Sequence, residues 1–106
     1  MAHQQFRNLI NAFNNGLKNG LPRKVMETLM PSDIHGKRFK ITAEGKTIHF
    51  GAYPFKVGAF IDHHDDEVRD AWYARHSKIL ISRNGVTMRA IDYPLSPDYY
   101  SARVLW

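Results

Sequence analysis

The chain has 106 residues, of which 43% are hydrophobic, and it carries a net charge of +5 with no cysteine. This length suffices for one small core, and the lack of cysteine excludes disulfides and thiolate zinc sites. No apolar run approaches the roughly 18 residues of a membrane-spanning helix, and residues 1–5 lack the layout of a signal peptide, so we expect a non-secreted protein with no membrane partner.

The positive charge is concentrated in the first part of the chain. Residues 1–60 contain nine lysines or arginines against three acids, whereas residues 61–82 contain three against five. A basic surface attracts phosphate through Coulomb forces and counterion release, and it attracts acidic protein surfaces as well. The charge distribution therefore leaves nucleic acid and acidic proteins open as partners.

Apolar residues near the N-terminus follow the spacing of one helical face. They are Phe6, Leu9, Ile10, Phe13 and Leu17. Gly20 is a suitable helix terminator, and Pro22 suits the first turn of a second short helix that runs to Met30. We expect residues 1–35 to form a helical N-terminal extension, whose apolar stripe either closes the protein's own core or docks on a partner.

The next segment predicts a basic β-hairpin, because apolar and polar side chains alternate on both sides of a turn at residues 44–46. The apolar set is Phe39, Ile41, Ala43, Ile48 and Phe50. The candidates for contact with nucleic acid or an acidic partner are Lys37, Arg38, Lys40 and Lys46. A hairpin alone is marginally stable in water, so this one must pack on a helix or join another strand.

A helix is predicted over residues 66–77, with Asp62 or Asp65 as its N-cap. Acids in its first turn, and Arg75 and His76 in its last, complement the helix dipole. The expected buried face comprises Val68, Ala71, Trp72, Arg75 and Ile79.

Two further elements complete the chain. Asn84-Gly85 is a strong hairpin-turn signal between residues 78–82 and 86–90. Ser96-Pro97 is typical of a helix start, with serine as N-cap and proline in the first turn. It predicts a short C-terminal helix that ends at about Leu105.

Residues 62–67 are the candidate for chemistry, because imidazole and carboxylate groups bind zinc, manganese or iron and serve in acid–base catalysis. The candidate metal ligands are His63, Asp65 and His76. Adjacent His63 and His64 do not easily point the same way, and the same residues form a normal capped helix start. We therefore expect no metal and no other cofactor.

Aromatic residues are numerous for so short a chain. Tyrosine, tryptophan and arginine dominate protein-interface hot spots, and aromatic rings also stack on bases. The indole of Trp106 is expected either to fold back onto the protein or to dock on a partner. Tyr99 and Trp106 are therefore candidate contact residues, together with Phe6 and Phe13 of the N-terminal stripe.

Three blocks between residues 36 and 106 form an ordered pattern. In the basic hairpin the pattern comprises Lys46, Phe50, Gly51 and Ala52. In the following helical region it comprises His63, Asp65, Trp72, Ala74, Arg75 and His76. At the C-terminal end it comprises Tyr99, Tyr100, Ser101, Leu105 and Trp106. In order and spacing these blocks resemble an uncharacterised family of small proteins encoded by tailed phages and large DNA viruses.

The resemblance implies a small virus-encoded protein that is part of a particle, and it implies no activity. His64 and Trp72 stand where the family has lysine and tyrosine, and Val68 where it has arginine. We interpret the three blocks as a fold signature, in which charged helix ends and the aromatic bulk of Phe50 and Trp106 hold the hairpin and helix together.

Taken together, the sequence predicts a small single α+β domain over residues 1–106. It has N-terminal helices, antiparallel hairpins packed on the central helix of residues 66–77, and a short C-terminal helix. Residues 36–106 form its family-like core.

The expected function is a non-enzymatic virion component, a minor capsid, cement or head–tail protein present in several copies. It would contact capsid or connector subunits in the virion and reside in the host cytoplasm before assembly. The first alternative is a viral accessory protein that binds nucleic acid without sequence preference, and the second is a small metal-dependent enzyme.

Overall fold

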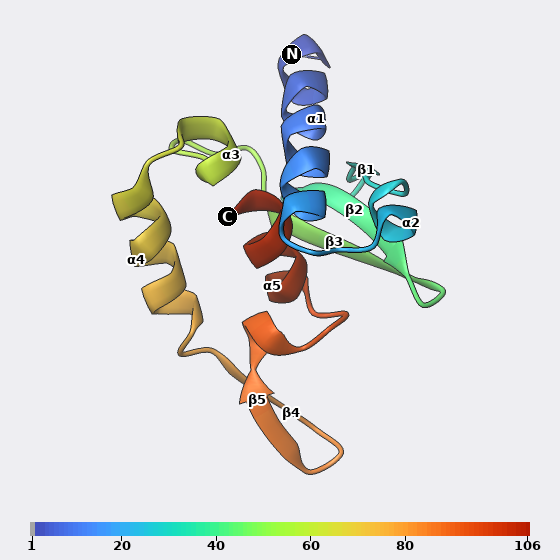
Figure 1. Cartoon of the computed structure of the whole chain (residues 1–106), viewed down its shortest axis with the longest axis vertical. Coiled ribbons are helices and arrows are strands. Elements are labelled where there is room, and N and C mark those ends of the chain that lie inside the picture. The colour runs from blue at the N-terminus through green and yellow to red at the C-terminus, as the bar shows by residue number, and fades with distance from the viewer. Residues whose placement is uncertain (1) are drawn as a thin grey trace.

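The polypeptide wraps its helices and a small sheet around its own C-terminal segment (Figure 1). The computed structural model describes the backbone of residues 2–106 and the side chains of residues 8–106. The helices are α1 (Ala2–Lys18), α2 (Arg23–Met26), α3 (Phe60–His63), α4 (Asp66–His76) and α5 (Pro97–Tyr100), the last continuing as the π-helical turn η2 (Ser101–Leu105). The strands are β1 (Met30–Pro31), β2 (Lys37–Ala43), β3 (Lys46–Ala52), β4 (Leu80–Arg83) and β5 (Val86–Arg89), and a 3-10 turn η1 spans Ala90–Asp92. These elements confirm the α+β class.

The long helix α1 packs against the C-terminal segment and α3. Its buried face centres on Ala12 and on Gly16, where a Cβ atom would lie 2.6 Å from the Met26 sulfur. Ile10 was expected on the buried stripe, but 49% of its surface is exposed. Ala12 and Gly16 permit close helix approach, and Leu9, Phe13 and Leu17 pack beside them against the main core cluster. The second helix ends at Met26, and Met30 lies instead in β1.

The three-stranded antiparallel sheet has the order β1–β2–β3. Its register places Phe39 opposite Phe50 and Ile41 opposite Ile48, so the predicted apolar face is confirmed. Phe39, Ile41 and Phe50 are fully buried in the main core cluster. Glu44 and Gly45 take positive φ angles of 51° and 74° in the turn that joins the two strands.

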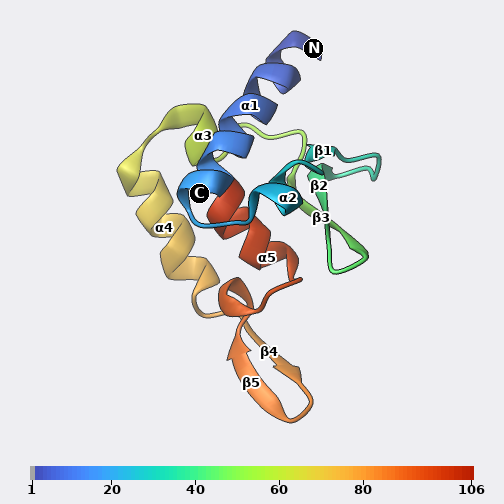
Figure 2. The same ribbon diagram turned by 45° about the vertical axis from the view of Figure 1, so that its right-hand side comes forward.

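The helix that covers this sheet is not the predicted one. β3 packs against α5 and η2, and β2 packs against α2, whereas α4 lies on the far side of the C-terminal segment (Figures 1 and 2). Tyr100, Val104 and Leu105 give the C-terminal segment a nearly continuous buried surface. The N-terminal turns of α4 carry acids, so α4 offers mainly Trp72 for burial. The larger apolar surface therefore occupies the centre.

Of the two predicted N-caps of α4, Asp62 and Asp65, the structure shows Asp65 in this role. Its carboxylate accepts hydrogen bonds from the backbone N–H groups of Glu67 and Val68. The expected inner face is partly wrong, because Ala71, Arg75 and Ile79 are exposed. The more covered side chains of α4 are Val68, Arg69, Trp72, Tyr73 and His76.

The β4–β5 hairpin extends away from the body (Figures 1 and 2). Asn84 and Gly85 have φ angles of 52° and 78°, as expected for the two central residues of a type I′ turn. The strands pair only with each other. None of their residues is buried. No helix among the described residues is long and apolar enough to cross a bilayer.

Candidate functional site

The predicted basic residues of the first hairpin do not form one exposed patch. Lys37 and Lys46 are exposed, but they lie at opposite ends of β2–β3, about 20 Å apart for a seven-residue strand. Lys40 is half-buried and lies 3.4 Å from the Asp33 carboxylate. A backbone hydrogen bond, and next the Lys40 ammonium, lower the pKa of Asp33.

Arg38 is a correction to the predicted contact surface, because only 2% of it is exposed. Its guanidinium donates two hydrogen bonds of 2.6 Å to the carboxylate of Asp62. The same carboxylate accepts a 2.7 Å bond from the Ala59 N–H, and the guanidinium lies 4.4 Å from the Phe55 ring centroid. This pair joins β2 to the start of α3, and it leaves no room for a phosphate on Arg38.

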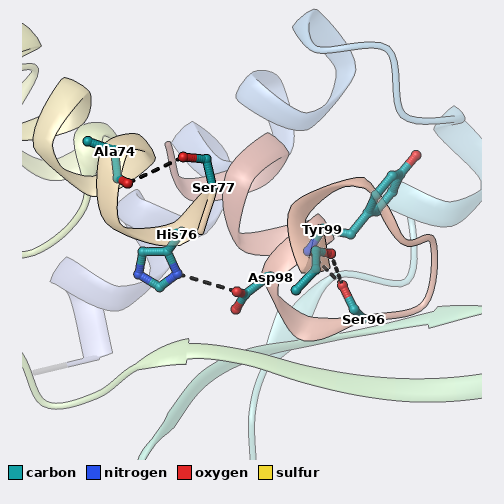
Figure 3. Close-up of polar contacts among 7 residues, drawn as sticks. Ala74, His76, Ser77, Ser96, Asp98 and Tyr99 are labelled. Atoms are coloured by element: carbon teal, nitrogen blue, oxygen red, sulfur yellow. Dashed lines mark hydrogen bonds and ion pairs between the residues drawn. The ribbon is translucent and has the colours of Figure 1, made fainter. Parts of the chain in front are cut away.

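The three candidate metal ligands are not brought together. The Asp65 carboxylate caps α4, and its backbone N–H donates to His63 Nδ1 at 2.9 Å. His76 Nδ1 lies instead 3.3 Å from Asp98 Oδ2 (Figure 3). No group of three or more metal-binding side chains occurs within the described part of the chain.

His63 and His76 belong to a run of ring contacts built on two tryptophans. Trp72 stacks on His76 with centroids 4.0 Å apart, and on Trp106 with centroids 5.2 Å apart. The ring of Trp106 in turn lies 5.6 Å from that of His63. The terminal indole therefore folds back onto α3 and α4. Trp106 packs within the protein, and only part of its surface is accessible to a partner.

A cleft of about 420 Å³ opens between the base of β2–β3, α4 and the start of α5. Its walls include Gly51 of the hairpin, Trp72 and His76 of α4, and Leu105 and Trp106 of the C-terminal segment. All three blocks of the sequence pattern thus contribute to its wall. A volume of this size lies within the range of small-ligand pockets.

His76 and Asp98 are the ionisable pair in this cleft (Figure 3). Both side chains are about one-quarter exposed. Asp98 was missed by the sequence analysis. It stands in the first turn of α5, where an acid is explained by the helix dipole alone, and nothing local relates it to a histidine 22 residues away.

Leu9, Phe13 and Leu17 of the N-terminal stripe pack against the main core cluster, and Leu9, Ile10 and Phe13 also line an open groove. This groove, of about 320 Å³, lies between α1 and α2 and the residues that follow α2. Its lining residues are Leu9, Ile10, Phe13, Met26, Glu27 and Leu29. Five of these six are apolar. The side chain of Phe6 lies outside the described side chains, so its place in the stripe stays a prediction. We call this feature the α1–α2 groove.

Tyr99 packs within the protein. The Arg103 guanidinium lies 3.7 Å from its ring centroid, and its backbone N–H donates to the N-cap hydroxyl of Ser96 (Figure 3). Arg103 also donates to the Ile91 carbonyl at 2.8 Å. Tyr99 is half-buried and ties α5 to η2 and to the segment before it.

Two further tyrosines have altered acidity. Burial raises the pKa of the Tyr73 and Tyr100 phenols above the usual value for tyrosine. The Tyr73 hydroxyl donates a 2.8 Å hydrogen bond to the Ala102 carbonyl, which fastens α4 to the C-terminal segment.

Comparison with known proteins covers part of the chain. Residues 27–76 match the model of a family of unknown function, DUF5754. The matched segment runs from the end of α2 through the three-stranded sheet to the end of α4. It contains both partners of the Arg38–Asp62 pair, and it contains Trp72 and His76. No curated protein and no solved structure matches the chain. The chain is thus similar over these 50 residues to a family without an assigned activity.

Proposed function

We propose that this protein is a virus-encoded accessory component of the virion, which acts through protein–protein contacts and not through a chemical reaction. The observation that carries the proposal is the α1–α2 groove. Its apolar lining is open to solvent, and 49% of the surface of Ile10 is exposed within it. An open apolar groove beside a helix can receive apolar side chains of a partner.

The shape of the groove fits an apolar segment of a neighbouring subunit. A lining of leucine, isoleucine, phenylalanine and methionine accepts aliphatic or aromatic side chains, and Glu27 is the one charged residue at its edge. Methionine adapts its shape to different partners. A minor capsid, cement or head–tail protein is repeated in a particle, so avidity lets each single contact be weak.

The viral assignment is supported by the three-block sequence pattern, and each block contributes residues to the wall of one cleft. The first and third blocks are in close contact at Gly51. A Cβ atom at this position would lie 2.8 Å from a Leu105 methyl carbon. The pattern therefore records how the hairpin, α4 and the C-terminal segment pack. This arrangement fits a scaffold that carries contact surfaces elsewhere.

The direct test is mass spectrometry of purified virus particles from the source after a high-salt wash. We expect the protein at a fixed number of copies per particle. Its absence from particles, with abundant protein in infected cells, would overturn the proposal.

A matched pair of variants tests the groove itself. Ile10 and Ile34 are 49% and 48% exposed, but only Ile10 lines the groove. Burying one isoleucine side chain contributes about 1.5–3 kcal/mol, so Ile10→Glu should lower incorporation into particles about tenfold or more. Ile34→Glu should leave incorporation unchanged. Equal incorporation of both variants would show that the groove takes no part in the contact with the particle.

A further inference from the structure

The projecting β4–β5 hairpin, with its flanks from Lys78 to Arg89, is here called the arm. Every charged residue of the arm is basic: they are Lys78, Arg83 and Arg89. No acid occurs anywhere between residues 71 and 91. In the first hairpin, Arg38 is buried in its ion pair with Asp62. All three basic residues of the arm, in contrast, are exposed.

We propose that the arm docks in a groove of duplex DNA and contacts its phosphates without sequence preference. This inference does not depend on the proposed function, because it concerns a surface separate from the α1–α2 groove. The arm is a two-stranded ribbon, and a ribbon of this kind fits the major groove of B-form DNA, which is about 12 Å wide.

The side chains of the arm suit a polyanion. In the β4–β5 register, Ser82 lies opposite Thr87 and Leu80 opposite Arg89, so these four exposed residues share one face. Hydroxyl, amide and guanidinium groups donate to phosphate and sugar oxygens. Arg89 Nε is paired with Asp92 at 2.7 Å, whereas Lys78 and Arg83 have no acidic side chain within 4.0 Å among the described residues.

The aliphatic residues of the arm fit the same partner. Val86, next to the turn, is 55% exposed, and Leu80 is 61% exposed. In the major groove, an aliphatic side chain can contact the thymine methyl group. Neither strand of the arm has a buried residue in the free protein. Docking on DNA would supply the packing that a two-stranded hairpin lacks on its own.

An acidic protein surface is the competing occupant. The chain itself carries exposed acids at Asp65, Asp66, Glu67 and Asp70. Asp65 caps α4, Asp66 and Glu67 lie in its first turn, and Asp66 is already paired with Arg69 at 3.2 Å. Because the α4 acids are partly neutralised by the helix end and by Arg69, duplex phosphate is the stronger partner for the arm.

The test is fluorescence anisotropy of a labelled 20-base-pair duplex of arbitrary sequence, titrated with the full chain at 50–200 mM salt. Each neutralised phosphate contributes about −0.9 to the slope of log K against log salt, so the two unpaired cations of the arm predict a slope of about −2. The double variant Lys78→Gln/Arg83→Gln should lower affinity at least tenfold and reduce the slope by about 2.

The control is Lys37→Gln/Lys46→Gln, which removes the same charge from two exposed residues of the first hairpin. It should leave most of the affinity intact. An equal loss in both double variants would show only a general effect of net charge and would overturn the assignment to the arm. Absence of binding by the unaltered protein at 50 mM salt would overturn it as well.

Two further measurements separate the competing partners. Duplex RNA has a narrow, deep major groove, so it should bind more weakly than duplex DNA, and equal binding would contradict docking of the arm in the groove. Sedimentation without DNA should show no salt-sensitive self-association. If the unaltered protein self-associates and the arm variant does not, the partner of the arm is a second copy and the proposal fails.

Discussion

The two hairpins of this protein are built from similar sequence and have opposite places in the structure. Both carry lysine or arginine, and both turn through two residues with positive φ. β2–β3 gains a third strand and is covered by α2 and the C-terminal segment, whereas β4–β5 pairs with nothing further. The difference shows that a basic hairpin pattern does not by itself locate a binding surface, because burial depends on which distant elements pack on it.

The largest expected effect concerns the Arg38–Asp62 pair of the first hairpin. Asp62→Ala leaves the Arg38 guanidinium buried without its carboxylate, so the free energy of unfolding should fall by about 3–5 kcal/mol. Chemical denaturation followed by circular dichroism measures this loss. Asp33→Ala removes an exposed partner of Lys40 and should leave the midpoint close to that of the unaltered protein. Similar losses in both variants would contradict a special role for the buried pair.

An aliphatic residue from each hairpin tests the comparison next. Ile41 in β2 is fully buried, and Ile41→Ala should cost about 2–5 kcal/mol through lost burial and the cavity that remains. Leu80 in β4 is 61% exposed, and Leu80→Ala should change stability by no more than about 0.5 kcal/mol. Thermal unfolding of the two variants decides the point. A large loss for Leu80→Ala would mean that the arm packs against the body.

The glycines of the two hairpins differ in their surroundings but not in the sign of φ. Gly51 and Gly85 have φ angles of 80° and 78°. A Cβ atom at Gly85 would meet nothing within 4 Å, whereas one at Gly51 would lie 2.8 Å from Leu105. Gly85→Ala should therefore cost about 1–2 kcal/mol from backbone strain alone, and Gly51→Ala should cost more. Equal melting temperatures would show that Leu105 moves aside freely.

The smallest effect is a pH dependence at α4. Burial raises the pKa of Tyr73 in the folded protein, so its contribution to stability is complete below the usual tyrosine pKa of 10.0 and is lost as the pH rises above that value. Tyr73→Phe should cost about 1 kcal/mol at neutral pH, because the bond to Ala102 disappears, and it should flatten the decline above pH 10. Tyr53→Phe, which alters a residue that is 39% exposed, is the control. An unchanged alkaline decline in Tyr73→Phe would contradict the assignment.

Local features of the fold were predictable because their causes are local. Asp65 and Ser96 cap helices as their sequence context indicates, and Asn84-Gly85 forms the expected turn. The alternation of the first hairpin also identified its buried face. Each of these features depends on residues within a few positions of one another, so a single sequence contains the necessary information.

The packing partners were not predictable in the same way. Arg38 looked like a surface cation because its partner Asp62 lies 24 residues away, and the partner of His76, which was a candidate metal ligand, was missed because Asp98 lies 22 residues away. The preference of the sheet for the C-terminal segment over α4 depends on the total apolar surface of each helix after folding. The spacing of residues along the chain therefore does not reveal which helix covers the sheet.

The contrast between a buried first hairpin and a free arm is tested most directly by native-state hydrogen exchange. We expect the hydrogen-bonded amides of Phe39, Ile41, Ile48 and Phe50 to exchange only through global unfolding, with the largest protection in the chain. The amides of Ile81 and Met88, which form a hydrogen-bonded pair of β4–β5, should exchange through local opening, with far smaller protection. Equal protection of the two hairpins would contradict the account, because it would make the arm part of the cooperative core.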